Sequence, residues 1–126
     1  MPAHMARDHR KLQAFTLADR LALLVYRSTS QFPVIERFGL QSQLRRAAVS
    51  VAANIVEGCG RDSEGDYLRF LDIAFASVRE AIYLIGLSQR LRFIDPRAAA
   101  EVEELGGRTA AALAALKKGV RGLRRA

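Results

Sequence analysis

The sequence predicts an all-α protein, a single antiparallel up-and-down four-helix bundle spanning residues 1–126. Apolar residues recur every three or four positions in four separate stretches, and no stretch of useful length alternates as a strand would. The three prolines, at positions 2, 33 and 96, leave the long stretches between them free to be helical. Half of the residues are apolar, which is enough for one core, and short connections favour antiparallel neighbours.

The first two helices are predicted on either side of a proline-containing connector. A polar N-terminal arm covers residues 1–11, and helical spacing of apolar residues then runs over residues 12–30. The connector, residues 31–39, contains a proline, closes with a glycine and has room for one short turn. The second helix starts near residue 40 and ends in the glycines of the segment EGCGR.

The third and fourth helices carry clear start signals. Ser63 is the expected N-terminal cap of the third helix, which is predicted to run to about Phe93. Asp95 is the expected cap of the fourth, with Pro96 at its first position. The pair Gly106-Gly107 predicts a local bend inside that last helix.

Several classes of function lack their usual residues. No window approaches 18 uninterrupted apolar residues and the first ten residues are polar, so we expect a cytoplasmic protein. The two histidines, His4 and His9, lie in the N-terminal arm, where they cannot complete a di-iron site. Cys59 has no partner cysteine and is expected to be structural. We therefore predict no catalytic residues, no metal, no cofactor and no enzymatic activity.

The charge is positive and concentrated at one end. The 20 Lys and Arg exceed the 13 Asp and Glu by seven, and five of these seven excess charges lie in the basic C-terminal end, residues 117–126. Such a cluster attracts phosphate, although a solvated helix end is an equally good interpretation. The candidate nucleic-acid contacts there are Lys117, Lys118, Arg121, Arg124 and Arg125, with Arg45, Arg46 and Arg61 as secondary candidates.

The second predicted helix has a narrow polar stripe beside an unusually wide apolar surface. The stripe consists of Gln43, Arg46, Ser50, Asn54, Glu57 and Arg61. It is either a solvent face with a Glu57–Arg61 pair, or a polar network at the centre of an oligomer. The additional apolar stripe consists of Val49, Ala52, Ala53 and Val56. It requires either a central position in the bundle or a subunit interface, of which we favour the interface.

Polar residues also interrupt the apolar row of the third helix. Ser77 and Glu80 fall in the row that otherwise holds large apolar side chains. A buried carboxylate without a partner would be costly, so we expect Glu80 to meet a cation or a hydrogen-bond donor. Arg46 is the candidate for that partner.

The central part of the chain resembles the bacterial four-helix bundle proteins that were first noted as reading frames in intervening sequences of 23S ribosomal RNA genes. The matching positions of the central motif are Phe32, Pro33, Glu36, Gly39, Leu40, Gln43, Arg45, Arg46, Ala47, Ser50, Asn54, Ile55, Glu57, Gly58 and Arg61. A second element matches through Ile73, Ala74, Ser77 and Glu80, with Ala76 where the family usually has glycine.

This resemblance implies an up-and-down bundle whose relatives assemble as cyclic homopentamers, and it carries over no catalytic residue. The gene location in the family suggests contact with RNA. The family is also similar to accessory proteins of diversity-generating retroelements, basic pentameric bundles that partner a reverse transcriptase. Both associations are analogies, because a fold does not determine a function.

The leading hypothesis is therefore a non-enzymatic, homo-oligomeric module that binds RNA or other nucleic acid through basic surfaces. The alternative is a protein interaction scaffold, or an accessory subunit of a nucleic-acid enzyme such as a reverse transcriptase.

Overall fold

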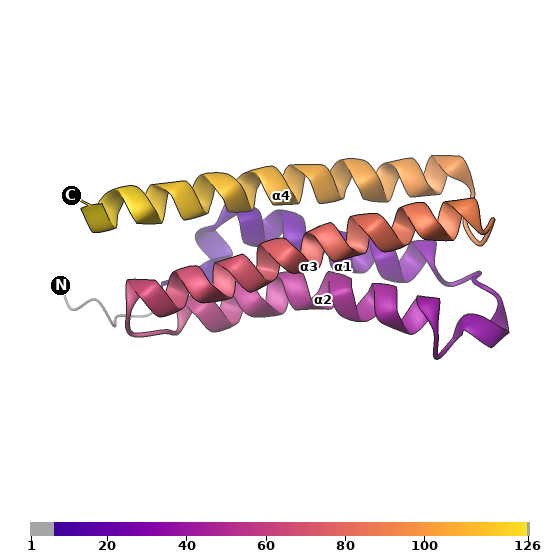
Figure 1. Cartoon of the computed structure of the whole chain (residues 1–126), viewed down its shortest axis with the longest axis horizontal. Helices are drawn as coiled ribbons and strands as arrows, with labels where there is room; N and C mark the ends of the chain where they lie inside the picture. Colours follow the sequence, from indigo (N-terminus) through magenta and orange to yellow (C-terminus); the bar gives the residue numbers. More distant parts are fainter. Residues whose placement is uncertain (1–6, 126) are drawn as a thin grey trace.

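The chain is all-α, as the sequence predicts, with four long helices arranged side by side (Figure 1). This computed structural model describes the backbone of residues 7–125 and the side chains of residues 7–122. The helices are α1 (Gln13–Ser28), α2 (Leu40–Cys59), α3 (Glu64–Arg90) and α4 (Pro96–Arg125), with short 3-10 turns η1 (His9–Lys11) and η2 (Val34–Glu36). Each long helix packs against the helices before and after it in a closed cycle, α4 returning to α1.

The predicted helix starts are confirmed by their caps. The Ser63 hydroxyl accepts a hydrogen bond from the backbone N–H of Asp66 at 3.0 Å. Asp95 Oδ1 accepts one from the backbone N–H of Ala98 at 2.9 Å, and Pro96 is the first residue of α4. Both side chains satisfy N–H groups that have no partner within the helix.

Helix α3 ends three residues before the predicted position. Leu91 is the C-terminal cap of α3, and the next residue, Arg92, adopts the left-handed conformation with φ of 62°. The Arg92 N–H then donates to the carbonyl of Gln89 and the Phe93 N–H to that of Ser88, both at 2.9 Å. This is the pairing that ends many helices, although glycine normally occupies the left-handed position. Because arginine and not glycine occupies position 92, the end of α3 could not be predicted from the sequence.

One glycine of the pair in α4, Gly106, marks a close approach to α3. The helix continues through both glycines without a break. A Cβ atom at Gly106 would lie 2.9 Å from Cγ1 of Ile82 on α3, whereas Gly107 has open space around it. Gly106 therefore lets the two helix backbones come close together.

The core runs along the bundle axis and contains large side chains from all four helices. Leu21, Leu44, Ile55, Leu71, Ile85 and Leu113 are fully buried. Cys59 is also buried at the end of α2, and burial raises the pKa of its thiol. Burial likewise raises the pKa of the neighbouring Tyr67 to about 12. In the described part of the chain, no helix is long and apolar enough to cross a membrane.

Candidate functional site

The middle of the predicted polar stripe of α2 lies at its contact with α3, where Ser50 and Asn54 form a hydrogen-bond chain with Ser77. The Asn54 side chain donates to Ser50 Oγ at 2.9 Å, and the hydroxyls of Ser50 and Ser77 are 2.9 Å apart. The Ser77 hydroxyl donates its proton to the carbonyl of Ile73 at 2.9 Å. Because that proton is used, Ser50 must be the donor to Ser77. These three side chains bond to one another within one chain, and the network expected at the centre of an oligomer stays a prediction.

Glu80 meets a hydrogen-bond donor, but the donor is Gln43 and not the arginine suggested by the sequence. Nε2 of Gln43 lies 3.4 Å from Glu80 Oε2. The ion pairs among the described residues do not include Arg46, which is exposed. Glu80 is exposed as well, so its carboxylate is hydrated and does not require a cation.

The Glu57–Arg61 pair forms as the solvent-face interpretation of the stripe predicts. Nη2 of Arg61 lies 2.7 Å from Glu57 Oε1, one helical turn away. The same guanidinium lies 4.5 Å over the ring of Phe70 on α3. Arg61 thus covers the end of the α2–α3 contact, and its guanidinium group is less available to a ligand.

Arg45 joins α2 to the end of α1. Its Nε donates to Thr29 Oγ1 at 2.9 Å, and its Nη2 donates to the carbonyl of Tyr26 at 3.1 Å. The guanidinium also lies 4.5 Å from the centre of the Tyr26 ring. Cations at a helix C-terminus are favoured by the helix dipole. The contacts of Arg45 are therefore those of a structural residue.

The basic C-terminal end is partly neutralised by α3. Lys117 Nζ lies 2.8 Å from Asp72 Oδ1 and 4.6 Å from the centre of the Phe75 ring, and only 14% of its side chain is exposed. Arg121 approaches the same carboxylate at 3.7 Å. Lys118 is exposed, whereas the side chains of Arg124 and Arg125 lie outside the described residues.

Three of the four residues of the additional apolar stripe of α2 face outward, whereas Ala52 is half-buried against the core, so the stripe as a whole does not occupy a central position within the bundle. Val49 is 42% and Val56 40% exposed, and Ala53 is exposed beside them. Leu23 and Tyr26 are exposed on α1. Since α1 and α2 are antiparallel and Tyr26 contacts Arg45, Leu23 lies level with Val49, one turn further along each helix. We call Leu23, Tyr26, Val49 and Val56 the α1–α2 apolar face.

A second apolar surface, which the sequence analysis missed, lies on the connector. Val34, Ile35 and Phe38 are 77%, 88% and 90% exposed. We call these three residues the connector knob. The sequence signal that could have revealed this surface is the presence of three large apolar residues in a polar connector. Large apolar side chains gathered at such exposure are typical of an interaction site.

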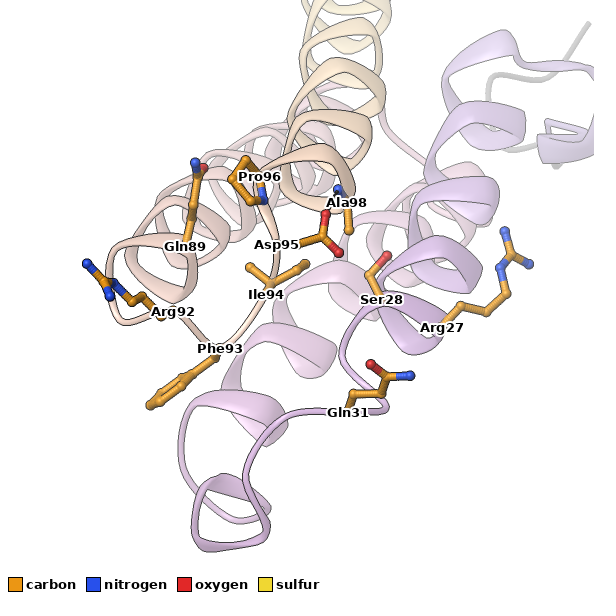
Figure 2. A pocket seen from close by; sticks show the side chains of 10 residues that line it. All are labelled: Arg27, Ser28, Gln31, Gln89, Arg92, Phe93, Ile94, Asp95, Pro96 and Ala98. Atoms are coloured by element: carbon orange, nitrogen blue, oxygen red, sulfur yellow. Dashed lines mark hydrogen bonds between the residues drawn. The ribbon is translucent and has the colours of Figure 1, made fainter.

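A pocket of about 680 Å³ opens at the connector end of the bundle, between the end of α1 and the α3–α4 turn (Figure 2). Arg27 and Arg92 stand at its opposite edges, and Asp95 and Ile94 lie between them. The complete lining is Arg27, Ser28, Gln31, Gln89, Arg92, Phe93, Ile94, Asp95, Pro96 and Ala98. The C-terminal end of α4 lies at the other end of the bundle (Figure 1).

Comparisons with known proteins agree on the fold. A family model described as 23S rRNA-intervening sequence protein matches residues 10–115. A solved structure of a protein of unknown function from the S23 ribosomal protein family, from Bacteroides thetaiotaomicron VPI-5482, superimposes with a TM-score of 0.76. It is 21% identical, and the alignment covers 83% of this chain and 95% of that one. No match was found among curated proteins.

Proposed function

The chain belongs to the 23S rRNA-intervening sequence protein family, and we propose that it is a non-enzymatic cytoplasmic module that assembles with copies of itself and binds RNA. The observation that carries the proposal is the pairing of two exposed apolar surfaces with a net charge of +7. The apolar surfaces serve assembly, and the charge serves nucleic-acid contact.

Self-assembly accounts for apolar side chains that a lone bundle leaves in water. The connector knob and the α1–α2 apolar face both lie outside the core of one chain. Burying such residues stabilises an association by about 25 cal/mol per Å² of apolar surface removed from water. By the family resemblance, we propose that the assembly is a ring of five copies.

A test of assembly uses variants of exposed residues, which leave the bundle intact. We expect Phe38→Ser to shift the protein from oligomer to monomer in sedimentation equilibrium, because the most exposed side chain of the knob is removed. Arg37→Ser, a polar change on the same exposed connector, is the matched control and stays oligomeric. A wild-type protein that sediments as a monomer at high concentration would refute the assembly.

RNA binding is proposed for the cations that remain available after the intrachain contacts are counted. Arg45, Arg61 and Lys117 already bind groups of the same chain. Among the secondary candidates Arg46 is exposed, and Lys118 is exposed in the basic C-terminal end. A ring would repeat each weak contact and so increase avidity.

The experiment is a salt titration of RNA affinity. We compare the triple variant Lys118→Gln, Arg124→Gln, Arg125→Gln with a charge-matched control, Arg20→Gln, Arg79→Gln, Arg108→Gln, made at exposed positions elsewhere. Each lost phosphate contact lowers the slope of log affinity against log salt by about 0.7 for a single strand. We expect this loss in the first variant only. Undetectable RNA binding by the wild type at low salt would reject the proposal.

The alternative function is a scaffold for another protein, including a reverse transcriptase to which this chain would be an accessory subunit. The connector knob favours it, because nucleic-acid contacts do not require aliphatic side chains such as Val34 and Ile35. An oligomer that binds no RNA at low salt would support the scaffold.

A further inference from the structure

The conformation of Arg92 is unfavourable for the residue that occupies it. Arg92 has φ of 62° at the position following α3, where the N–H groups of Arg92 and Phe93 close the helix. Glycine is preferred there because it has no Cβ atom to clash in the left-handed region. Glycine in place of Arg92 would relieve the local strain. The arginine side chain is thus the feature that needs an explanation.

The side chain of Arg92 stands at the edge of the 680 Å³ pocket, with Arg27 of the last turn of α1 at the opposite edge (Figure 2). Both arginines are exposed, and the ion pairs among the described residues use other cations. A guanidinium matches a phosphate group through paired N–H donors. The two edges of the pocket therefore suit an anionic oxygen ligand.

The lining of the pocket includes groups that a nucleobase can use. Gln31 and Gln89 provide amide donors and acceptors, and Phe93 provides a flat apolar surface. The Phe93 ring packs at 5.9 Å against the buried Phe32, which fixes its position. Bases in single-stranded RNA are bound by stacking on aromatic rings and by hydrogen bonds to their edges. The volume falls within the range of roughly 300–1,000 Å³ of small-molecule sites.

One carboxylate, that of Asp95, shares the pocket with the two arginines. Its Oδ1 accepts the N–H of Ala98 at 2.9 Å, at the N-terminus of α4. The positive end of the helix dipole offsets part of this negative charge. Because Arg27 and Arg92 are two cations against this one carboxylate, the pocket has a net positive charge.

We propose that this pocket binds one nucleotide unit, either free or within single-stranded RNA, with Arg92 on the phosphate, the base against Phe93, and Arg27 adding positive charge at the opposite edge. The RNA form of this inference rests on the proposed RNA-binding function. It places a site at the end of the bundle opposite the C-terminal end of α4 (Figure 1). Arg92 holds a strained position because its side chain binds the phosphate.

The test is one substitution that should raise the thermal stability and weaken ligand binding. Arg92→Gly should raise the Tm by about 3 °C, because the strain at the left-handed position is removed. The same change should weaken binding of a labelled oligouridine about tenfold, because a charge-assisted contact is lost. Arg27→Gln should weaken binding less than Arg92→Gly does, because it removes positive charge at the opposite edge and not the phosphate contact, and it should leave the Tm unchanged. Arg37→Gln, on the exposed connector outside the pocket, is the charge-matched control.

Three ligands distinguish the sources of the nucleotide: uridine monophosphate, oligouridine, and heparin as a polyanion without bases. Arginine-dependent binding of either uridine ligand supports the site, and binding of the monophosphate alone identifies a free nucleotide. If RNA binding requires Lys118, Arg124 and Arg125 but not Arg92, the inference is wrong while the proposed function stands. Equal loss in the Arg37→Gln variant, equal dependence of heparin binding on Arg92, or no binding of either uridine ligand also overturns it.

Discussion

Replacing Gly58 with alanine should weaken the contact between α2 and α3, although alanine is the better helix former. A Cβ atom at this buried position would lie 2.9 Å from Cβ of Phe70 and 3.2 Å from Cδ1 of Tyr67. The Phe70 Cβ is bonded to the α3 backbone and cannot rotate away. The two helices would have to separate, and every core contact near this end would loosen.

The size of the effect follows from two opposing contributions. Alanine in place of glycine inside a helix stabilises by about 1 kcal/mol, whereas overpacking a core costs about 1–3 kcal/mol. The Cβ–Cβ distance of 2.9 Å lies well inside van der Waals contact, so the upper end of that cost applies. The net expectation for Gly58→Ala is a loss of about 2 kcal/mol.

Gly107→Ala is the matched comparison, because that glycine lies inside α4 with open space around it. It should gain about 1 kcal/mol. Urea unfolding followed by circular dichroism at 222 nm measures both free energies. If Gly58→Ala unfolds at the same urea concentration as the wild type or higher, with an unchanged m value, the close approach of α2 and α3 is wrong.

Three further predictions concern single side chains. Burial raises the pKa of Tyr67 from 10.0 to about 12. The stability that its neutral hydroxyl contributes is therefore complete below pH 10 and is lost as the pH rises to 12. In urea unfolding, Tyr67→Phe should lose about 2 kcal/mol less stability than the wild type over this pH range. Thr29→Val should cost about 1–2 kcal/mol in thermal unfolding because Arg45 loses its acceptor, and Thr29→Ser should cost less. Asp72→Asn should strengthen RNA binding several-fold by releasing Lys117, and the proposed RNA contact at that end is contradicted if affinity is unchanged.

The fold was predictable because its signals are local. Ser63 and Asp95 cap their helices through N–H groups three residues away, and such chemistry is visible in a short stretch of sequence. The end of α3 was predicted wrongly because Arg92 occupies a left-handed position, and a sequence indicates such a position only through glycine or asparagine. The close approach at Gly106 depends on Ile82, which belongs to another helix.

The candidate site was less predictable, because a count of charges does not reveal their partners. Arg45 and Lys117 are equivalent to other cations in the sequence, but Thr29 and Asp72 of neighbouring helices hold them. The pocket between Arg27 and Arg92 joins the ends of two helices that are distant in the chain. Helical spacing identifies which residues share a face, but not which faces meet.

The two exposed apolar surfaces also bear on the geometry of the proposed assembly. The connector knob lies on the connector and the α1–α2 apolar face lies along two helices, so a contact between knob and face joins unlike surfaces. In a head-to-tail assembly one surface stays open at each end until a ring closes, whereas in a two-fold dimer both knob–face contacts form between the same two copies.

Mixing two variants tests whether knob and face bind each other. Phe38→Ser disables the knob and Val49→Asp disables the face, so each variant alone should be monomeric. Mixed at equal concentration, they should form a one-to-one heterodimer in sedimentation velocity, because each supplies the surface that the other lacks. Two variants that remain monomeric when mixed would show that knob and face do not bind each other. The wild type then distinguishes the two geometries, because a ring sediments as an oligomer larger than a dimer, whereas reciprocal knob–face contacts about a two-fold axis give a dimer.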